Sequence, residues 1–150
     1  MSTACAERLQ ADIKSAMKSR EKSKLAALRL ISAVFKQYEV DERAEVNDSV
    51  AVELLTRMAK QRRESISQYQ TAERADLIEK EQFELDLITE YLPAQLSDAE
   101  IATHIDAAIA QTGAASMRDM GKVMGALNTD LKGRADMAAV SAAVKARLAG

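Results

Sequence analysis

Apolar side chains recur at intervals of three and four residues along most of this 150-residue chain. Such spacing places them on one face of an α-helix, whereas a half-buried strand would show strict alternation. One clear example is the set Leu25, Leu28, Ile31, Phe35 and Tyr38. Tryptophan is absent, only 3% of the residues are aromatic and proline occurs once, whereas strong helix formers such as alanine and leucine are abundant. We therefore predict an all-α fold.

Caps and breaks divide the chain into seven predicted helices. Asn47, Asp48 or Ser49 can cap a helix, and Pro93 ends a long helical stretch. The first four helices are expected over about residues 3–18, from about 23 to the polar stretch 41–49, 49–71 and 74–91. The last three are expected from Ser97 to Gly113, from Ser116 to Gly133, and from a cap at Asp136 onward.

The stretch LPAQLSDAE, residues 92–100, is the predicted junction between two domains. Ser97 followed by Glu100 has the pattern of a capping box, which marks the start of a new helix soon after Pro93 has ended the preceding one. We predict an N-terminal helical bundle of about four helices over residues 1–96 and a small three-helix C-terminal domain over residues 97–150.

Charge and cysteine content restrict the function classes that are open to the chain. The net charge is -2, so any contact with nucleic acid requires a local basic patch rather than an overall positive charge. Cys5 is the single cysteine, which excludes an internal disulfide, and no Cys/His spacing indicates zinc. The sequence has neither the apolar region of a signal peptide nor an apolar run of about 20 residues that could span a membrane. We expect a soluble cytoplasmic protein without metal, cofactor or membrane contact.

Three charged residues fall on the apolar faces of the third and fourth predicted helices. Arg62 lies between Met58 and Ile66, and Glu81 and Glu84 share a face with leucines. If the two helices form an antiparallel hairpin about a turn near Glu73, Arg62 lies eleven residues before the turn and Glu84 eleven after it, so the two side chains should meet. We expect them to pair, because a lone buried charge would be too costly. A carboxylate metal site is the alternative, but that architecture requires Glu-x-x-His motifs. Since the single histidine is in the other predicted domain, we interpret the three residues as a structural ion pair.

Catalytic residues are not visible in the sequence. His104 has no serine, cysteine or aspartate near it in a recognisable spacing, and Cys5 has no local base that would activate it. Gly121 and Lys122 are followed by Val123, where a phosphate-binding loop would have serine or threonine. We assign no catalytic residue.

The sixth predicted helix carries glycines and cations on one face. At 100° per residue this face holds Arg118, Gly121, Lys122, Gly125, Asn128, Thr129 and Lys132. Gly133 is expected to end the helix, and Arg134 extends the row of cations beyond it. In one interpretation the glycines admit a second helix, or the segment breaks into two short helices at Gly121. In the other, bare backbone and nearby cations form a seat for phosphates. The residues alone leave both interpretations open.

The segments KQRRESISQYQTAERADLIEKEQFELDLITEYLPAQLS and DMGKVMGALNTDLKGRAD closely resemble the GatB/YqeY family, most distinctively at residues 121–125 and 132–136. The resemblance implies a helical bundle followed by a three-helix domain similar to the tail of the GatB subunit of glutamine-dependent tRNA amidotransferase. In that enzyme the tail contacts tRNA, while ammonia release and substrate activation belong to other domains. A family label of carbon-nitrogen ligase with glutamine as amido donor therefore accompanies the resemblance, although no residues here could perform that reaction alone.

Three hypotheses follow from the residues and the resemblance together. The leading one is a non-catalytic tRNA- or RNA-binding module whose contact strip is Arg118, Gly121, Lys122, Gly125, Lys132, Gly133 and Arg134. The second is an adaptor whose glycines pack against a partner helix. The third is an accessory component of an amidotransferase that acts only within a complex. The expected partners are tRNA or another RNA, or a protein of the translation or amidotransferase machinery.

Overall fold

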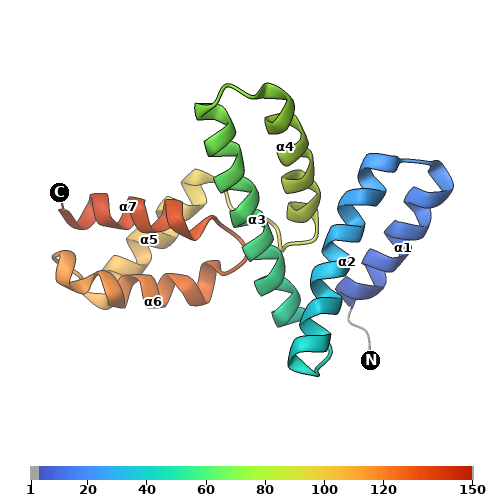
Figure 1. Ribbon diagram of the computed structural model, residues 1–150. Coiled ribbons are helices and arrows are strands. Elements are labelled where there is room, and N and C mark those ends of the chain that lie inside the picture. The colour runs from blue at the N-terminus through green and yellow to red at the C-terminus, as the bar shows by residue number, and fades with distance from the viewer. Residues whose placement is uncertain (1–3, 150) are drawn as a thin grey trace. The chain divides into compact units, whose positions relative to one another are not determined.

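The computed structural model describes residues 4–149 and forms seven α-helices over that range (Figure 1). They are α1 (Ala4–Ser19), α2 (Lys22–Glu42), α3 (Asp48–Thr71), α4 (Ala75–Glu90), α5 (Asp98–Thr112), α6 (Met120–Leu131) and α7 (Met137–Ala149), with a 3-10 turn, η1 (Met117–Asp119), before α6. Within the described range there is no strand, so the all-α prediction is confirmed. Residue 3, where the first helix was expected to begin, lies outside that range.

The chain divides into two compact units, Met1–Pro93 and Ala94–Gly150, which we call unit 1 and unit 2. In unit 1, α1 pairs with α2 and α3 pairs with α4, and α2 also contacts α3 and α4. The residues buried most completely are the leucines and isoleucine at the centre of these contacts, Leu9, Leu28, Ile31 and Leu55. These side chains come from α1, α2 and α3, so one core holds the three helices together.

Unit 2 is built around α6, which contacts both α5 and α7. Its buried face presents Val123, Leu127 and Leu131, and these side chains pack in one cluster with residues of α5 and α7. The predicted capping box is confirmed, because the Ser97 hydroxyl accepts a hydrogen bond from the Glu100 N–H at 3.2 Å and the Glu100 carboxylate accepts one from the Ser97 N–H at 3.1 Å.

The sixth helix is shorter than predicted at both ends. Residues 117–119 form the 3-10 turn instead of α-helix, and the Asp119 carboxylate accepts hydrogen bonds from the N–H groups of Ala115 and Ser116 at 2.9 and 3.3 Å. At the other end α6 stops at Leu131, because Lys132 already has an extended ψ of 122°. None of the described helices combines the length and apolarity needed to cross a membrane.

Candidate functional site

The exposed face of α6 includes two positions without a side chain, Gly121 and Gly125. Gly121, Lys122 and Gly125 are exposed, while Val123 and Leu127 on the opposite side are buried in the core of unit 2. Apart from adjoining backbone, no heavy atom lies within 4 Å of the position where a Cβ atom would stand on Gly121 or Gly125. Among the described residues of unit 2, therefore, no helix packs against the two glycines.

Cations lie at both ends of this face. Arg118 is exposed in the 3-10 turn, and Lys122 is exposed in the first turn of α6. Lys132 is exposed just beyond the last residue of α6, and Arg134 is half-buried in the loop that follows. Ten residues of helix correspond to about 15 Å, so Lys122 and Lys132 belong to opposite ends of α6. The structure therefore brings Arg118, Gly121, Lys122 and Gly125 together and leaves the other three predicted residues near the far end.

Gly133 does not share the exposed face. It is buried, and its φ of 75° lies in the left-handed region that glycine adopts without strain. Its carbonyl accepts a hydrogen bond from Gln95 Nε2 at 2.7 Å, and the carbonyl of Arg134 accepts one from the Leu96 N–H at 2.9 Å. Gly133 and the Arg134 backbone therefore hold the segment that leads into α5. The positive charge of the half-buried Arg134 side chain interacts with Glu100.

An acidic residue stands beside the cations of α6. The N–H groups of Ala115 and Ser116 lower the pKa of Asp119, and the charge of Lys122 lowers it further. The carboxylate is therefore ionised at neutral pH and offsets part of the positive charge of Arg118 and Lys122. This end of α6 can attract an anion only weakly by charge, so a ligand needs close contact as well.

The α3–α4 hairpin brings Arg62 to both glutamates. Arg62 Nε donates a hydrogen bond to Glu84 Oε2 at 2.8 Å, and Glu81 Oε2 lies 3.6 Å from the same nitrogen. The three side chains are only 12–18% exposed, and Glu81 Oε2 is buried without a hydrogen-bond partner. Two carboxylates thus share one guanidinium. The described residues contain no group of three or more histidine, cysteine, aspartate or glutamate side chains that could hold a metal ion.

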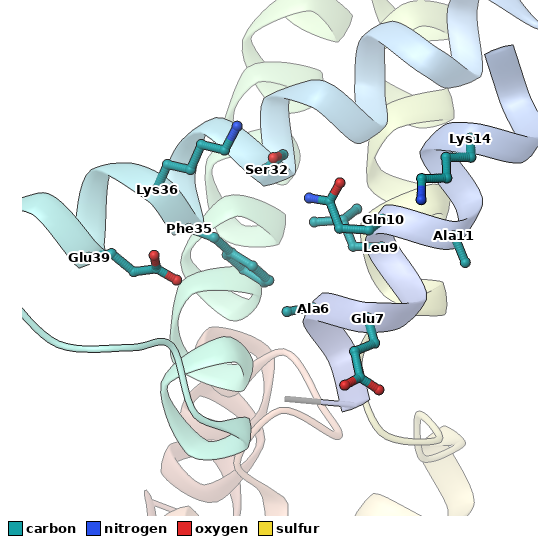
Figure 2. A pocket seen from close by; sticks show the side chains of 10 residues that line it. All are labelled: Ala6, Glu7, Leu9, Gln10, Ala11, Lys14, Ser32, Phe35, Lys36 and Glu39. Atoms are coloured by element: carbon teal, nitrogen blue, oxygen red, sulfur yellow. The ribbon is translucent and has the colours of Figure 1, made fainter. Parts of the chain in front are cut away.

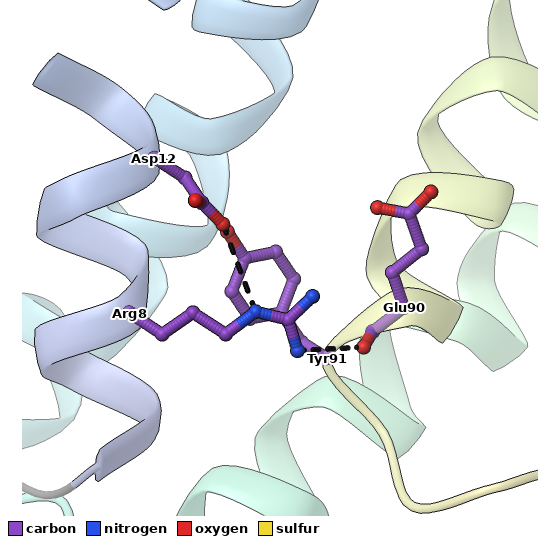
Figure 3. Close-up of polar contacts among 4 residues, drawn as sticks. All are labelled: Arg8, Asp12, Glu90 and Tyr91. Atoms are coloured by element: carbon purple, nitrogen blue, oxygen red, sulfur yellow. Dashed lines mark hydrogen bonds and ion pairs between the residues drawn. The ribbon is translucent and has the colours of Figure 1, made fainter. Parts of the chain in front are cut away.

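A second polar cluster in unit 1 was not predicted (Figure 3). The Tyr91 hydroxyl donates a hydrogen bond to Asp12, and the Arg8 guanidinium lies 4.5 Å from the centre of the Tyr91 ring. Arg8 also donates to the Glu90 carbonyl at 3.0 Å and forms an ion pair with Asp12 at 3.7 Å. Burial, and then the contact with Asp12, raises the pKa of Tyr91. The cluster joins α1 to the C-terminal end of α4.

A groove between α1 and α2 is lined by both apolar and charged side chains (Figure 2). It encloses about 500 Å³, with Leu9 and Phe35 among the apolar residues that line it and Lys14 and Lys36 among the charged ones. Cys5 lies outside this lining, and burial, followed by the charge of Asp48, raises the pKa of its thiol. A raised pKa keeps the thiol protonated and a poor nucleophile.

Comparisons with known proteins identify the family to which the chain belongs. The model of a family described as "Yqey-like protein" matches residues 6–148. The chain is 34% identical over 131 residues to "Altered inheritance of mitochondria protein 41, mitochondrial" of Pyrenophora tritici-repentis, covering 85% of this chain and 71% of that protein. For the proteins of the same name in Eremothecium gossypii and Saccharomyces cerevisiae the identities are 35% and 30%, over 66% and 60% of this chain. The chain spans 56% and 49% of the length of these two relatives.

These names overturn one prediction. The expected cytoplasmic location is wrong on this comparison, because the relatives are named as mitochondrial proteins. The prediction rested on the lack of an apolar leader, whereas mitochondrial targeting segments are amphipathic and rich in arginine, so that lack could not decide the compartment. With its model matched over residues 6–148, the chain belongs to the YqeY-like protein family.

Proposed function

We propose that unit 2 is a non-catalytic RNA-binding module that uses the exposed face of α6. The observation that carries this proposal is the open space at Gly121 and Gly125. Each glycine inside a helix costs about 1 kcal/mol relative to alanine. Because a Cβ atom at either position would meet no atom of the described residues beyond the adjoining ones, the fold of unit 2 does not require the two glycines. A ligand that approaches the helix backbone closely would explain them.

A sugar-phosphate backbone fits the residues around the glycines. Arg118 and Lys122 can neutralise phosphates at the start of α6, and Lys132 and Arg134 can do so at its end. The resemblance of this segment to the tRNA-contacting tail of GatB makes tRNA the RNA that we propose. Since two to four cations are involved, the logarithm of affinity should fall with the logarithm of salt concentration with a slope of roughly -2 to -3.

The test is binding of the full chain to unfractionated tRNA at several salt concentrations. Lys122→Glu should weaken binding and reduce the salt slope by about 1. The matched control is Lys145→Glu, because Lys145 is also an exposed helical lysine of unit 2 but lies outside the contact face. Affinity for tRNA no tighter than for heparin, or equal losses from the two variants, would contradict the proposal.

Docking of a partner helix on α6 is the alternative that the same open space supports. Small residues four apart let two helices approach closely. In that case Gly125→Leu should abolish the interaction, whereas Lys122→Glu should change it little. A role as accessory component of an amidotransferase requires a complex, and it would use one of these two modes of contact.

A further inference from the structure

The face of α2 that points away from the core of unit 1 is apolar except at Gln37. At 100° per residue it carries a row of five exposed residues, which we call the α2 seam: Ala26, Leu30, Ala33, Gln37 and Val40. The two larger apolar side chains are well exposed, Leu30 at 43% and Val40 at 73%. Single exposed apolar residues are normal on proteins, but a continuous row on one helix marks an interaction surface.

The seam has the spacing of a coiled coil. Its members alternate at intervals of four and three residues, as the a and d positions of a heptad do. The flanking g positions of the same register are occupied by Lys22, Arg29 and Lys36, which we call the basic row. All three are exposed, and none forms an ion pair with another residue in the described part of the chain. The seam spans about 21 Å, the length over which a partner helix of some four turns can lie.

The other flank of the seam opens onto two hollows. One lies between α2 and α4, encloses about 450 Å³ and is lined by Ala26 and Phe83, which is 43% exposed, and also by the acidic Asp76, Glu79 and Glu84. The other lies between α2 and α3, encloses about 260 Å³ and is lined by Gln37 and Leu54 and also by the acidic Asp41 and Glu42. A helix lying on the seam could therefore bury apolar side chains in these hollows, whereas its carboxylates belong on the opposite flank, beside the basic row.

We propose that the α2 seam binds an acidic amphipathic helix of another protein. Three cations at g positions favour carboxylates on the facing positions of the partner. A second copy of this chain is disfavoured, because antiparallel pairing would set two basic rows against each other. Parallel pairing would place them opposite Ala27, Val34 and Asp41, of which only the last carries a charge. This inference concerns unit 1 and goes beyond the RNA binding proposed for unit 2.

The apolar character of the seam separates this partner from other anions. RNA would gain nothing from Leu30 and Val40, and no aromatic side chain stands in the seam to stack on a base. A membrane surface calls for larger apolar side chains than the two alanines supply. The alanines do suit a helix, since they let its backbone come close while Leu30 and Val40 fit between its side chains.

The test uses a labelled peptide of about three heptads with leucine at a, alanine at d and glutamate at e and g, bound to the full chain. The control peptide has lysine in place of every glutamate. We expect the acidic peptide to bind with an affinity that falls as ionic strength rises. The variant Lys22→Glu/Arg29→Glu/Lys36→Glu should weaken it by about tenfold or more and should gain affinity for the lysine peptide instead. Lys145→Glu is the matched remote control.

Ala33→Glu places a charge in the middle of the seam and should weaken both peptides, while circular dichroism shows whether the variant still folds. Equal binding of the two peptides by the unaltered chain would overturn the proposal. It would also be overturned if sedimentation of the chain alone shows a dimer that Ala33→Glu dissociates, because the seam would then bind a second copy. Tighter binding to vesicles that contain anionic lipid than to the acidic peptide would also overturn the proposal, because it would assign the seam to a membrane surface.

Discussion

The hydroxyl of Tyr91 donates a hydrogen bond to the carboxylate of Asp12, a residue that lies 79 positions earlier in the chain. Tyr91 is only 8% exposed, so loss of this bond would leave part of the carboxylate without its partner. We expect Tyr91→Phe to lower the free energy of unfolding by about 1–2 kcal/mol, because hydrogen bonds to charged groups contribute at the upper end of the usual range. Denaturant unfolding at neutral pH measures this change. No change in the midpoint would mean that Arg8 alone holds Asp12.

The same contact predicts a loss of stability at alkaline pH. Since the pKa of Tyr91 is raised above its ordinary value of 10, the folded protein holds the phenolic proton more tightly than the unfolded chain does. The stabilisation is present below pH 10 and is lost as the pH rises toward the raised pKa. Tyr91→Phe should therefore unfold with a weaker dependence on pH above 10 than the unaltered chain. Identical pH profiles for the two proteins would contradict the assignment.

Arg62 should be far more important for stability than either of its partners. Arg62→Ala leaves Glu81 and Glu84 in a largely buried site, and we expect it to cost about 3 kcal/mol of unfolding free energy. Glu81→Gln removes one of two carboxylates that share one guanidinium and should change stability by less than about 1 kcal/mol. Thermal unfolding of the two variants beside the unaltered chain tests the contrast. Equal costs would show that Glu81 contributes to the pair as much as Arg62 does.

Two glycines of unit 2 should respond to alanine with opposite signs. At Gly125 a Cβ atom meets open space on a helix, so Gly125→Ala should stabilise α6 by about 0.5–1 kcal/mol. At Gly133 the φ of 75° and the burial of the residue make alanine unfavourable, and Gly133→Ala should cost roughly 1–2 kcal/mol. Hydrogen exchange of the α6 amides reports both effects. If Gly125→Ala is more stable but binds tRNA less well, the glycine serves the ligand rather than the fold.

Acid should weaken the start of α5 and the turn before α6. The Ser97 N–H lowers the pKa of Glu100 below its ordinary value of 4.5, and the N–H groups of Ala115 and Ser116 lower that of Asp119 below 3.8. Both carboxylates therefore contribute stability above these ordinary values, and that contribution is lost as the pH falls through their lowered pKa values. We expect the melting temperature to decrease as the pH is lowered from 4.5. The melting temperature of Glu100→Gln should decrease less steeply over this range. Equal slopes would show that the carboxylate of Glu100 does not matter to the cap.

The sequence predicted local structure better than it predicted contacts between distant residues. The spacing of apolar residues gave the helices, and the short turn between α3 and α4 allowed Arg62 and Glu84 to be matched by counting from it. The Asp12–Tyr91 contact had no such guide, since the only signal was Arg8 and Asp12 four residues apart on α1. Which helix covers that pair depends on how the whole unit packs, and side-chain spacing contains no information about it.

The exposed face of α6 likewise combines features that the sequence predicted with features that it did not. The helical period correctly separated Gly121, Lys122 and Gly125 from the buried Val123 and Leu127. The period could not place Gly133, which was expected to end the helix. The helix ends at Leu131, and beyond a helix end the direction of a residue follows from backbone turns rather than from a period. The hydrogen bonds of Gln95 and Leu96 that hold this loop come from residues far away in the sequence.

The length of α6 has a consequence for any ligand that binds it. A helix of 12 residues with two glycines would not persist alone in water, because nucleation is unfavourable and so few residues cannot offset it. Its exposed face therefore exists only while Val123, Leu127 and Leu131 remain inserted among α5 and α7. A substitution in this buried row would loosen the surface that a ligand meets, although the substituted side chain never touches the ligand. Mutations that impair binding should accordingly appear on both sides of α6, and only those on the exposed side should leave the folded protein at least as stable as before.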